Sequence, residues 1–200
     1  MSVVIPARDE ADRIEAALEA LADQRGIDGK PLDPRGYEVI VLANNCSDST
    51  SDLVRRSARK LDSRLVIHLF ERSFSDEQAH VGNARRWLMD LACARLEAVG
   101  QPQGLIASTD ADTRVARTWV SASLAEADSG ADAVAGIIQV DPRGLRELGR
   151  TVRRAYWRDR VHRRLLVELE ELIDPNPLDV FPRHDFHGGA SLAITPKMYR

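Results

Sequence analysis

Residues 105–113 read LIASTDADT, and this stretch decides how the rest of the chain is interpreted. The apolar run at its start has the length of a buried strand. Asp110 and Asp112 follow at the point where that strand would end. Ligands bind outside the carboxyl ends of the strands in an open α/β sheet, and two carboxylates one residue apart can hold a hard cation such as Mg²⁺ or Mn²⁺. The alternative is that Asp110 caps a turn and Asp112 is solvated.

Strand-like and helix-like segments alternate through the first 140 residues. The alternation predicts an α/β fold with a mostly parallel central sheet covered by helices on both faces. Right-handed crossovers place all the carboxyl ends at one edge. We therefore expect Asp9, the polar turn at 44–48 and the two aspartates to line one crevice. The expected strands are 2–6, 37–42, 65–70, 105–109 and 133–140, and the expected helices are 10–25, one ending at 60, 80–99 and 119–128.

Composition excludes several classes of protein. A chain of 200 residues that is 44% hydrophobic can bury one real core. Its net charge of −3 gives no basic field, so no nucleic-acid partner is expected. Cys46 and Cys93 lie far apart and lack metal-ligand spacing, which favours a reducing compartment over a disulfide scaffold. The sequence shows no signal peptide and no transmembrane span, so we expect a cytoplasmic protein.

The character of the chain changes after Pro142. Apolar residues keep helical spacing, but arginine dominates, which predicts a long helix packed by one face and solvated elsewhere. The functional alternative is a basic surface beside an anionic acceptor, a diphosphate or a membrane. An irregular loop is expected at 178–186, followed by a strand that begins with glycines. The arginines are Arg143, Arg146, Arg150, Arg153, Arg154, Arg158, Arg160, Arg163 and Arg164.

Five segments in order resemble the family-2 glycosyltransferases of the GT-A fold. The opening strand ends in a proline and an acid, the second strand ends in an Asp-Ser-Thr turn, and a helix begins with Gly-x-x-Arg. The TDAD stretch resembles the family's DxD motif, and a Gly-rich strand follows later. These segments are 3–10, 37–50, 80–85, 109–112 and 188–194.

The resemblance implies a single GT-A-type domain. Residues 1–140 would be its nucleotide-sugar-binding half. Residues 141–200 would hold an acceptor-side helical segment and the Gly-rich strand, ending before the catalytic base. The implied enzyme (EC 2.4 class) moves a sugar from a nucleotide-diphosphate donor to an unknown acceptor, for which an anionic molecule is one candidate. Transfer would be metal-assisted and, by family default, inverting.

The resemblance also assigns roles to individual residues. Asp112 and Asp110 would bind Mn²⁺ or Mg²⁺, with His187 and His184 as weak further candidates. Asp185 is a weak candidate for the catalytic base, which is otherwise expected beyond Arg200. The turn carries Asn44-Asn45-Cys46 where the family commonly has two acids, so base contact would rest on Asp48 or on asparagine amides. The implied donor-binding residues are Pro6, Ala7, Glu10, Asn44, Asp48, Arg85, Asp110 and Ala111.

Other functions remain open from the sequence. A sugar-phosphate nucleotidyltransferase would need a glycine-rich phosphate loop, and residues 7–10 (ARDE) contain no glycine. A phosphatase with an Asp-x-Asp nucleophile loop is disfavoured by Arg114 and by the late position of the motif. A non-catalytic sugar-nucleotide-binding relic is a further alternative. The inner face of the membrane, reached by peripheral contact, is an alternative location.

Overall fold

The structure is a computed structural model that describes residues 1–175 and 188–200. The chain divides into two compact units. The first contains residues 1–134 and 189–200, and the second contains residues 135–188. The functional division expected at residue 140 stays a prediction. In the described part of the chain, no helix is both long and apolar enough to cross a membrane.

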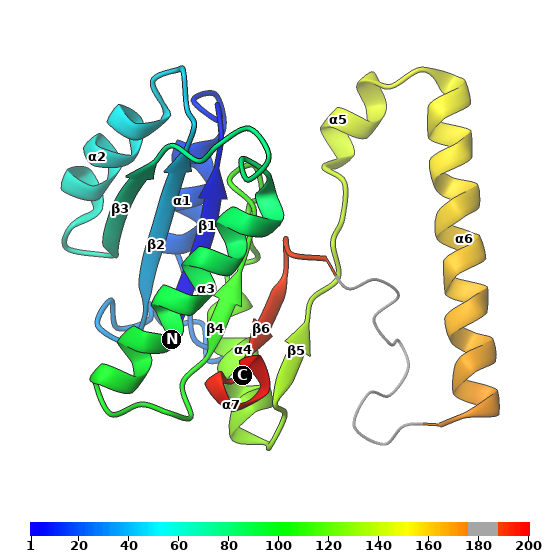
Figure 1. Cartoon of the computed structure of the whole chain (residues 1–200). Helices are drawn as coiled ribbons and strands as arrows, with labels where there is room; N and C mark the ends of the chain where they lie inside the picture. The colour runs from blue at the N-terminus through cyan, green and yellow to red at the C-terminus, as the bar shows by residue number, and fades with distance from the viewer. Residues whose placement is uncertain (176–187) are drawn as a thin grey trace. The chain divides into compact units, whose positions relative to one another are not determined.

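A six-stranded sheet forms the centre of the first unit (Figure 1). Its strand order is β3-β2-β1-β4-β6-β5. β1 pairs in parallel with both β2 and β4, β2 pairs in parallel with β3, and β6 runs antiparallel to β4. The predicted, mostly parallel sheet is therefore confirmed. The strands are β1 (Ser2–Ala7), β2 (Glu38–Asn44), β3 (Val66–Arg72), β4 (Ile106–Ser108), β5 (Ala133–Ala135) and β6 (Leu192–Ile194).

Helices cover both faces of this sheet, as predicted. Side chains alternate along a strand, so Val3 and Ile5 pack on one face with residues of α1 (Ile14–Ala22), α2 (Thr50–Leu61) and α4 (Trp119–Asp128). Val4 packs on the other face, against α3 (Val81–Ala98), with Tyr199 of α7 (Pro196–Tyr199) beside it. Burial on both faces explains why β1 and β2 are continuous apolar runs rather than alternating ones.

Several predicted elements are shorter than expected, and the strand expected to begin with glycines begins instead at Leu192, because Gly189 and Ala190 lie in a turn. α1 begins at Ile14 rather than at residue 10. The amides of Glu10 and Ala11 donate to the side chains of Thr50, at the start of α2, and of Asp48. β5 ends at Ala135 rather than at residue 140. It lies at the edge of the sheet, and its neighbour β6 is only three residues long. A longer β5 would have no strand to pair with.

The arginine-rich segment, predicted as one helix, forms two helices in the second unit. α5 (Pro142–Glu147) is capped by the Asp141 side chain, which accepts from Arg143 N at 2.8 Å. Leu148 and Gly149 then take extended backbone angles, and α6 (Arg150–Ile173) follows. Glycine costs roughly 1 kcal/mol in a helix interior relative to alanine, which favours a break there. Val167 is the one buried residue of α6.

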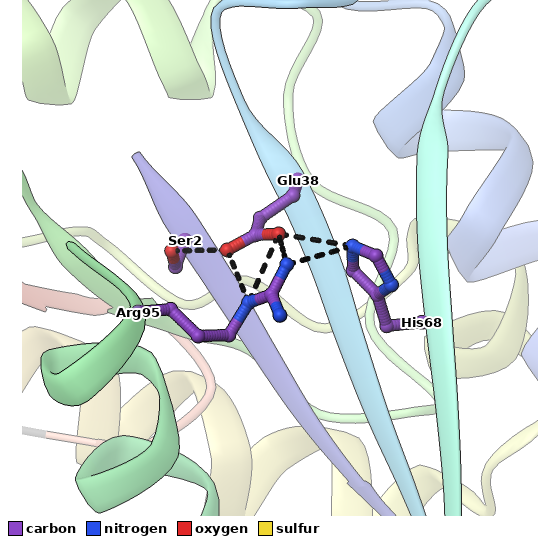
Figure 2. A network of polar contacts seen from close by, with 4 residues as sticks. All are labelled: Ser2, Glu38, His68 and Arg95. Carbon is purple, nitrogen blue, oxygen red and sulfur yellow. Dashed lines mark hydrogen bonds and ion pairs between the residues drawn. The ribbon is translucent and has the colours of Figure 1, made fainter. Parts of the chain in front are cut away.

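A polar network ties β1, β2, β3 and α3 together near the start of the strands (Figure 2). The Glu38 carboxylate accepts from Ser2 Oγ at 2.8 Å and from Arg95 Nη2 at 2.6 Å, and His68 Nε2 lies 3.0 Å from it. Burial alone would raise the pKa of Glu38. The hydrogen bonds from Arg95 and Ser2 outweigh it, so this pKa lies below its usual value of 4.5.

Replacing this carboxylate tests the network. Glu38→Gln should lower the free energy of unfolding at pH 7 by roughly 2 kcal/mol, because hydrogen bonds to charged groups contribute about 1.5–3 kcal/mol each. A lowered pKa stabilises the fold above the unfolded-state pKa, and this contribution is lost as the pH falls through the folded-state value. The difference between the two proteins should therefore shrink as the pH is lowered below 4.5.

Urea denaturation followed by circular dichroism measures this difference. Asp52→Asn is the matched control, because it removes the same charge from an ion pair whose aspartate is 75% exposed. Such surface pairs contribute roughly 0–1 kcal/mol. Equal losses in the two variants, or a pH-independent loss in Glu38→Gln, would contradict the role given to Glu38.

Candidate functional site

The candidate site lies at the carboxyl ends of β1, β2 and β4. These strands end at Ala7, Asn44 and Ser108, and they are parallel neighbours in the sheet. The loops that follow them therefore leave the sheet at the same edge. Most of the donor and metal residues suggested by the sequence lie in or directly before these three loops.

Asp9 joins the loop after β1 to the loop after β2. Its Oδ1 accepts from Ser47 N at 2.7 Å, from Ser47 Oγ at 3.1 Å and from Asp48 N at 3.2 Å. The Ser47 backbone bond is the main cause that holds the pKa of Asp9 below its usual value. Asp9 adopts a φ of 54° to make these bonds, in the left-handed region that aspartate and asparagine enter more readily than most residues.

Asp48 makes the reciprocal connection. Its Oδ2 accepts from Ala11 N at 3.0 Å, and its Oδ1 accepts from the backbone N and the hydroxyl of Thr50. The Thr50 hydroxyl is the main cause of a lowered Asp48 pKa. The same hydroxyl accepts from Glu10 N at 2.8 Å. Oδ2 of Asp48 thus holds the two loops together, and Oδ1 fixes Thr50 at the start of α2. The suggested contact of Asp48 with the nucleotide base stays a prediction.

Asn45 anchors the second loop on its other side. Its φ is 51°, and its side chain exchanges two 2.9 Å hydrogen bonds with the backbone of Phe74. Asn44 precedes it as the buried last residue of β2 and donates weakly to Asn45 at 3.4 Å. The asparagines that replace the expected acids therefore serve to fix the turn.

The two aspartates of the central motif have different surroundings. Asp110 pairs with Arg85 of α3, whose Nε also donates to Ser108 Oγ at 2.9 Å. Asp112 is 48% exposed, and Arg13 Nη1 lies 3.6 Å from its carboxylate. Ala111 between them is buried, whereas the side chains of both aspartates are partly exposed. Arg85 thus forms an ion pair with Asp110. The suggested position of Arg85 near the diphosphate stays a prediction.

Glu10 brings a third carboxylate to this edge. Arg13 Nη1 lies 3.6 Å from Glu10 as well as from Asp112. Burial, followed by the negative charge of Asp112, raises the pKa of Glu10 above its usual value. The charges of Asp110 and Asp48 act on the pKa of Glu10 in the same direction, and Arg13 opposes them. A divalent cation is the species that such a group of oxygens would attract.

Within the described part of the chain, three other potential metal ligands have their ligand atoms close together. Asp9, Cys46 and Asp48 place one ligand atom each within 4.8 Å of one another. The carboxylates of Asp9 and Asp48 already accept six hydrogen bonds, four of which join one loop to the other. Burial also raises the pKa of the Cys46 thiol, which disfavours the thiolate that a metal needs. This group is better suited to fixing the loops than to holding an ion.

The remaining predicted residues are placed as follows. Pro6 and Ala7 are buried at the end of β1. Asp185, His184 and His187 lie outside the described residues, so their roles stay predictions. Sequence reasoning missed Arg13 and Ser108 because neither belongs to a recognisable motif.

The two cross-loop aspartates give a direct prediction. Asp9→Ala should speed amide hydrogen exchange at Ser47 and Asp48, in the opposite loop, because their N–H groups lose their acceptor. Asp33→Ala is the control, since Asp33 accepts from Arg35 N within its own turn. Exchange measured by NMR should change across the two loops only in the first variant. Unchanged protection of Ser47 and Asp48 would show that the aspartate does not hold the loops.

The sequence and the structure of this chain both resemble those of known proteins. The profile described as Glycosyl transferase family 2 matches residues 2–178. The structure resembles the mannosyltransferase PcManGT from Pyrobaculum calidifontis, solved with GDP-Man and Mn²⁺, with a TM-score of 0.50 and 24% identity over 69% of this chain and 35% of that one. It also resembles residues 1–349 of TarS from S. aureus, solved with UDP, with a TM-score of 0.50 and 18% identity over 69% of this chain and 38% of that one.

These likenesses concern the fold, and the chain spans little more than a third of either structure. No curated protein sequence matches it. The GT-A fold expected from the sequence is confirmed by the mixed α/β architecture and by these neighbours. With the family profile matching most of its length, the chain belongs to glycosyl transferase family 2.

Proposed function

We propose that this chain binds a nucleotide-diphosphate sugar and takes part in transfer of the sugar to an acceptor. The observation that carries the proposal is the group of three carboxylates, Glu10, Asp110 and Asp112, at one edge of a family-2 sheet. The similar mannosyltransferase was solved with GDP-Man and Mn²⁺, and the similar TarS fragment with UDP. A nucleoside diphosphate group is what these two bound molecules have in common.

The residues at this edge fit a divalent cation. The Asp110 and Asp112 side chains are 38% and 48% exposed, so oxygens of both reach solvent. Among the residues that the structure describes, Arg85 pairs with Asp110, and Arg13 pairs with Glu10 and Asp112. When bound, Mn²⁺ or Mg²⁺ would neutralise charge on the donor's diphosphate and on the leaving nucleotide. We assign Asp112 as the principal ligand and Asp110 as the second.

The chain's own residues would orient the donor. Pro6 and Ala7 end β1, and Asn44 ends β2, so their backbone borders the space beyond the sheet edge. We assign the nucleotide pocket to these residues and to Ala111, with Glu10 beside the ribose. Inverting transfer also needs a base to take the acceptor's hydroxyl proton. Asp185 remains the candidate within the chain for that role.

The arginine-rich helices α5 and α6 suggest the charge of the acceptor. The exposed residues of α5 and α6 include Arg143, Arg154 and Arg158, which favour an anionic partner. We propose an acceptor that carries a phosphate or carboxylate. This assignment rests on charge alone and is separate from the donor site.

The cation proposal is tested at Asp112. Asp112→Asn keeps the shape of the side chain and removes its charge, so it should weaken Mn²⁺-dependent binding of GDP and UDP by at least about ten-fold. Isothermal titration calorimetry, with and without Mn²⁺, measures the effect. Asp128→Asn is the matched control, because it removes an exposed carboxylate at the end of α4. Unchanged or metal-independent affinity in Asp112→Asn would refute the assignment.

The acceptor proposal is tested by reversing charge on α6. The double variant Arg153→Glu and Arg154→Glu should weaken binding to vesicles containing a polyprenyl phosphate, because like charges then face each other. Nucleotide binding should be unaffected. The double variant Arg56→Glu and Arg59→Glu makes the same charge change on α2 and should bind as the wild type does. Loss of nucleotide binding or of folding in the α6 variant would instead favour a structural role for these arginines.

A further inference from the structure

The side chain of Arg85 connects α3 with two other segments of the first unit. It lies in the second turn of α3, and its guanidinium donates to Ser108 at the end of β4 and to Asp110 just beyond it. The same guanidinium lies against Gly189 of the C-terminal segment. The Arg85 side chain is 21% exposed, so it is largely packed rather than free in solvent.

The backbone that carries Arg85 is fixed at both ends of its helical turn. His80 caps α3 by accepting from Asn83 N at 3.2 Å. The neighbouring residues Ala84 and Leu88 are fully buried in the core beneath the sheet. Arg85 therefore reaches Asp110 from a rigid base, as residues that orient a ligand must.

Gly189 leaves the space that the guanidinium occupies. A Cβ at this position would lie 2.3 Å from Arg85 Cζ and 2.5 Å from Nη1, which is too close for any side chain. The segment cannot easily retreat, because Trp119 Nε1 donates to Ser191 Oγ at 2.9 Å and β6 pairs with β4. A side chain at residue 189 would therefore have to displace Arg85.

The arrangement gives the two aspartates separate tasks. Arg85 holds Oδ1 of Asp110 and so fixes the orientation of that carboxylate. Asp112 pairs, among the described residues, with Arg13 at 3.6 Å, and the Arg13 side chain is 63% exposed. An exposed pair of this kind is weak and easily exchanged. The carboxylate that a cation can take over is thus Asp112, while Asp110 is oriented in advance.

We propose that Arg85 is a positioning residue that orients Asp110 for cation binding, and that a glycine at position 189 is required for it to do so. The proposal rests on the donor-binding function proposed above. Arg85 acts through Asp110 and is given no contact with the nucleotide. Partners that orient metal ligands typically change metal affinity by about 10–100-fold when they are removed.

A double-mutant cycle on the full 200-residue chain tests the proposal. Arg85→Gln and Gly189→Ala should each weaken Mn²⁺ affinity by roughly 10–100-fold, measured by electron paramagnetic resonance of free Mn²⁺. The double variant should be no weaker than the more affected single variant, because the shorter glutamine leaves room for the alanine methyl. Arg85→Lys should fall between wild type and Arg85→Gln, since lysine retains the charge but not the planar fork.

The control is the neighbouring arginine. Arg86 is 81% exposed and lies 4.0 Å from Asp90, so Arg86→Gln should leave Mn²⁺ affinity unchanged. The melting temperature of each variant, measured in parallel, completes a second cycle that does not depend on the metal. The losses in melting temperature from Arg85→Gln and Gly189→Ala should also be non-additive, because the clash exists only when both Arg85 and the alanine are present.

The possible outcomes separate this proposal from the function on which it rests. If the wild-type protein does not bind Mn²⁺, either alone or in the presence of GDP or UDP, the proposed function is wrong. The role of Arg85 in cation binding is then wrong as well. Wild-type binding that is unchanged in Arg85→Gln would overturn the positioning role alone. Additive losses from Arg85→Gln and Gly189→Ala, in affinity or in melting temperature, would overturn the requirement for glycine.

Discussion

The parallel pairing of β1 with β2 on one side and β4 on the other is the constraint on which the candidate site depends. It brings three loops, separated by up to about a hundred residues in sequence, to one edge of the sheet. The register is held by burial on both faces, since Val3 and Ile5 belong to one apolar cluster and Val4 to the other. A shift of one residue would exchange these sets and move every loop.

The acidic residues at this edge do different work because their surroundings differ. Asp9 and Asp48 accept hydrogen bonds from the backbone of the opposite loop, and their lowered pKa values follow from those bonds. Glu10 and Asp112 both pair with the exposed Arg13, and burial together with the Asp112 charge raises the pKa of Glu10. One set of carboxylates is therefore used to fix the loops, and the other retains charge that a ligand can neutralise.

The spacing of apolar residues along the sequence predicted the helices and strands that pack by a regular apolar face. α4 was expected at residues 119–128 and has those bounds, and β1 differs by one residue. The same patterns missed features set by distant partners. The short β5 depends on the length of β6, and the break at Gly149 divides a continuous helical pattern. The bonds from the amides of Glu10 and Ala11 to Thr50 and Asp48 likewise join distant parts of the sequence. At the site, the motif located Asp110 and Asp112, but nothing local could reveal that Arg85 pairs with Asp110 beneath Gly189.

The central claim is that a divalent cation binds at Asp112 and Asp110 together with a nucleoside diphosphate. Crystals of this chain grown with Mn²⁺ and GDP or UDP, measured at the manganese absorption edge, test it most directly. The account predicts an anomalous peak at Asp112 and Asp110 with the diphosphate beside it. A peak held instead by Asp9, Cys46 and Asp48, or nucleotide bound with no manganese near Asp112, would contradict it.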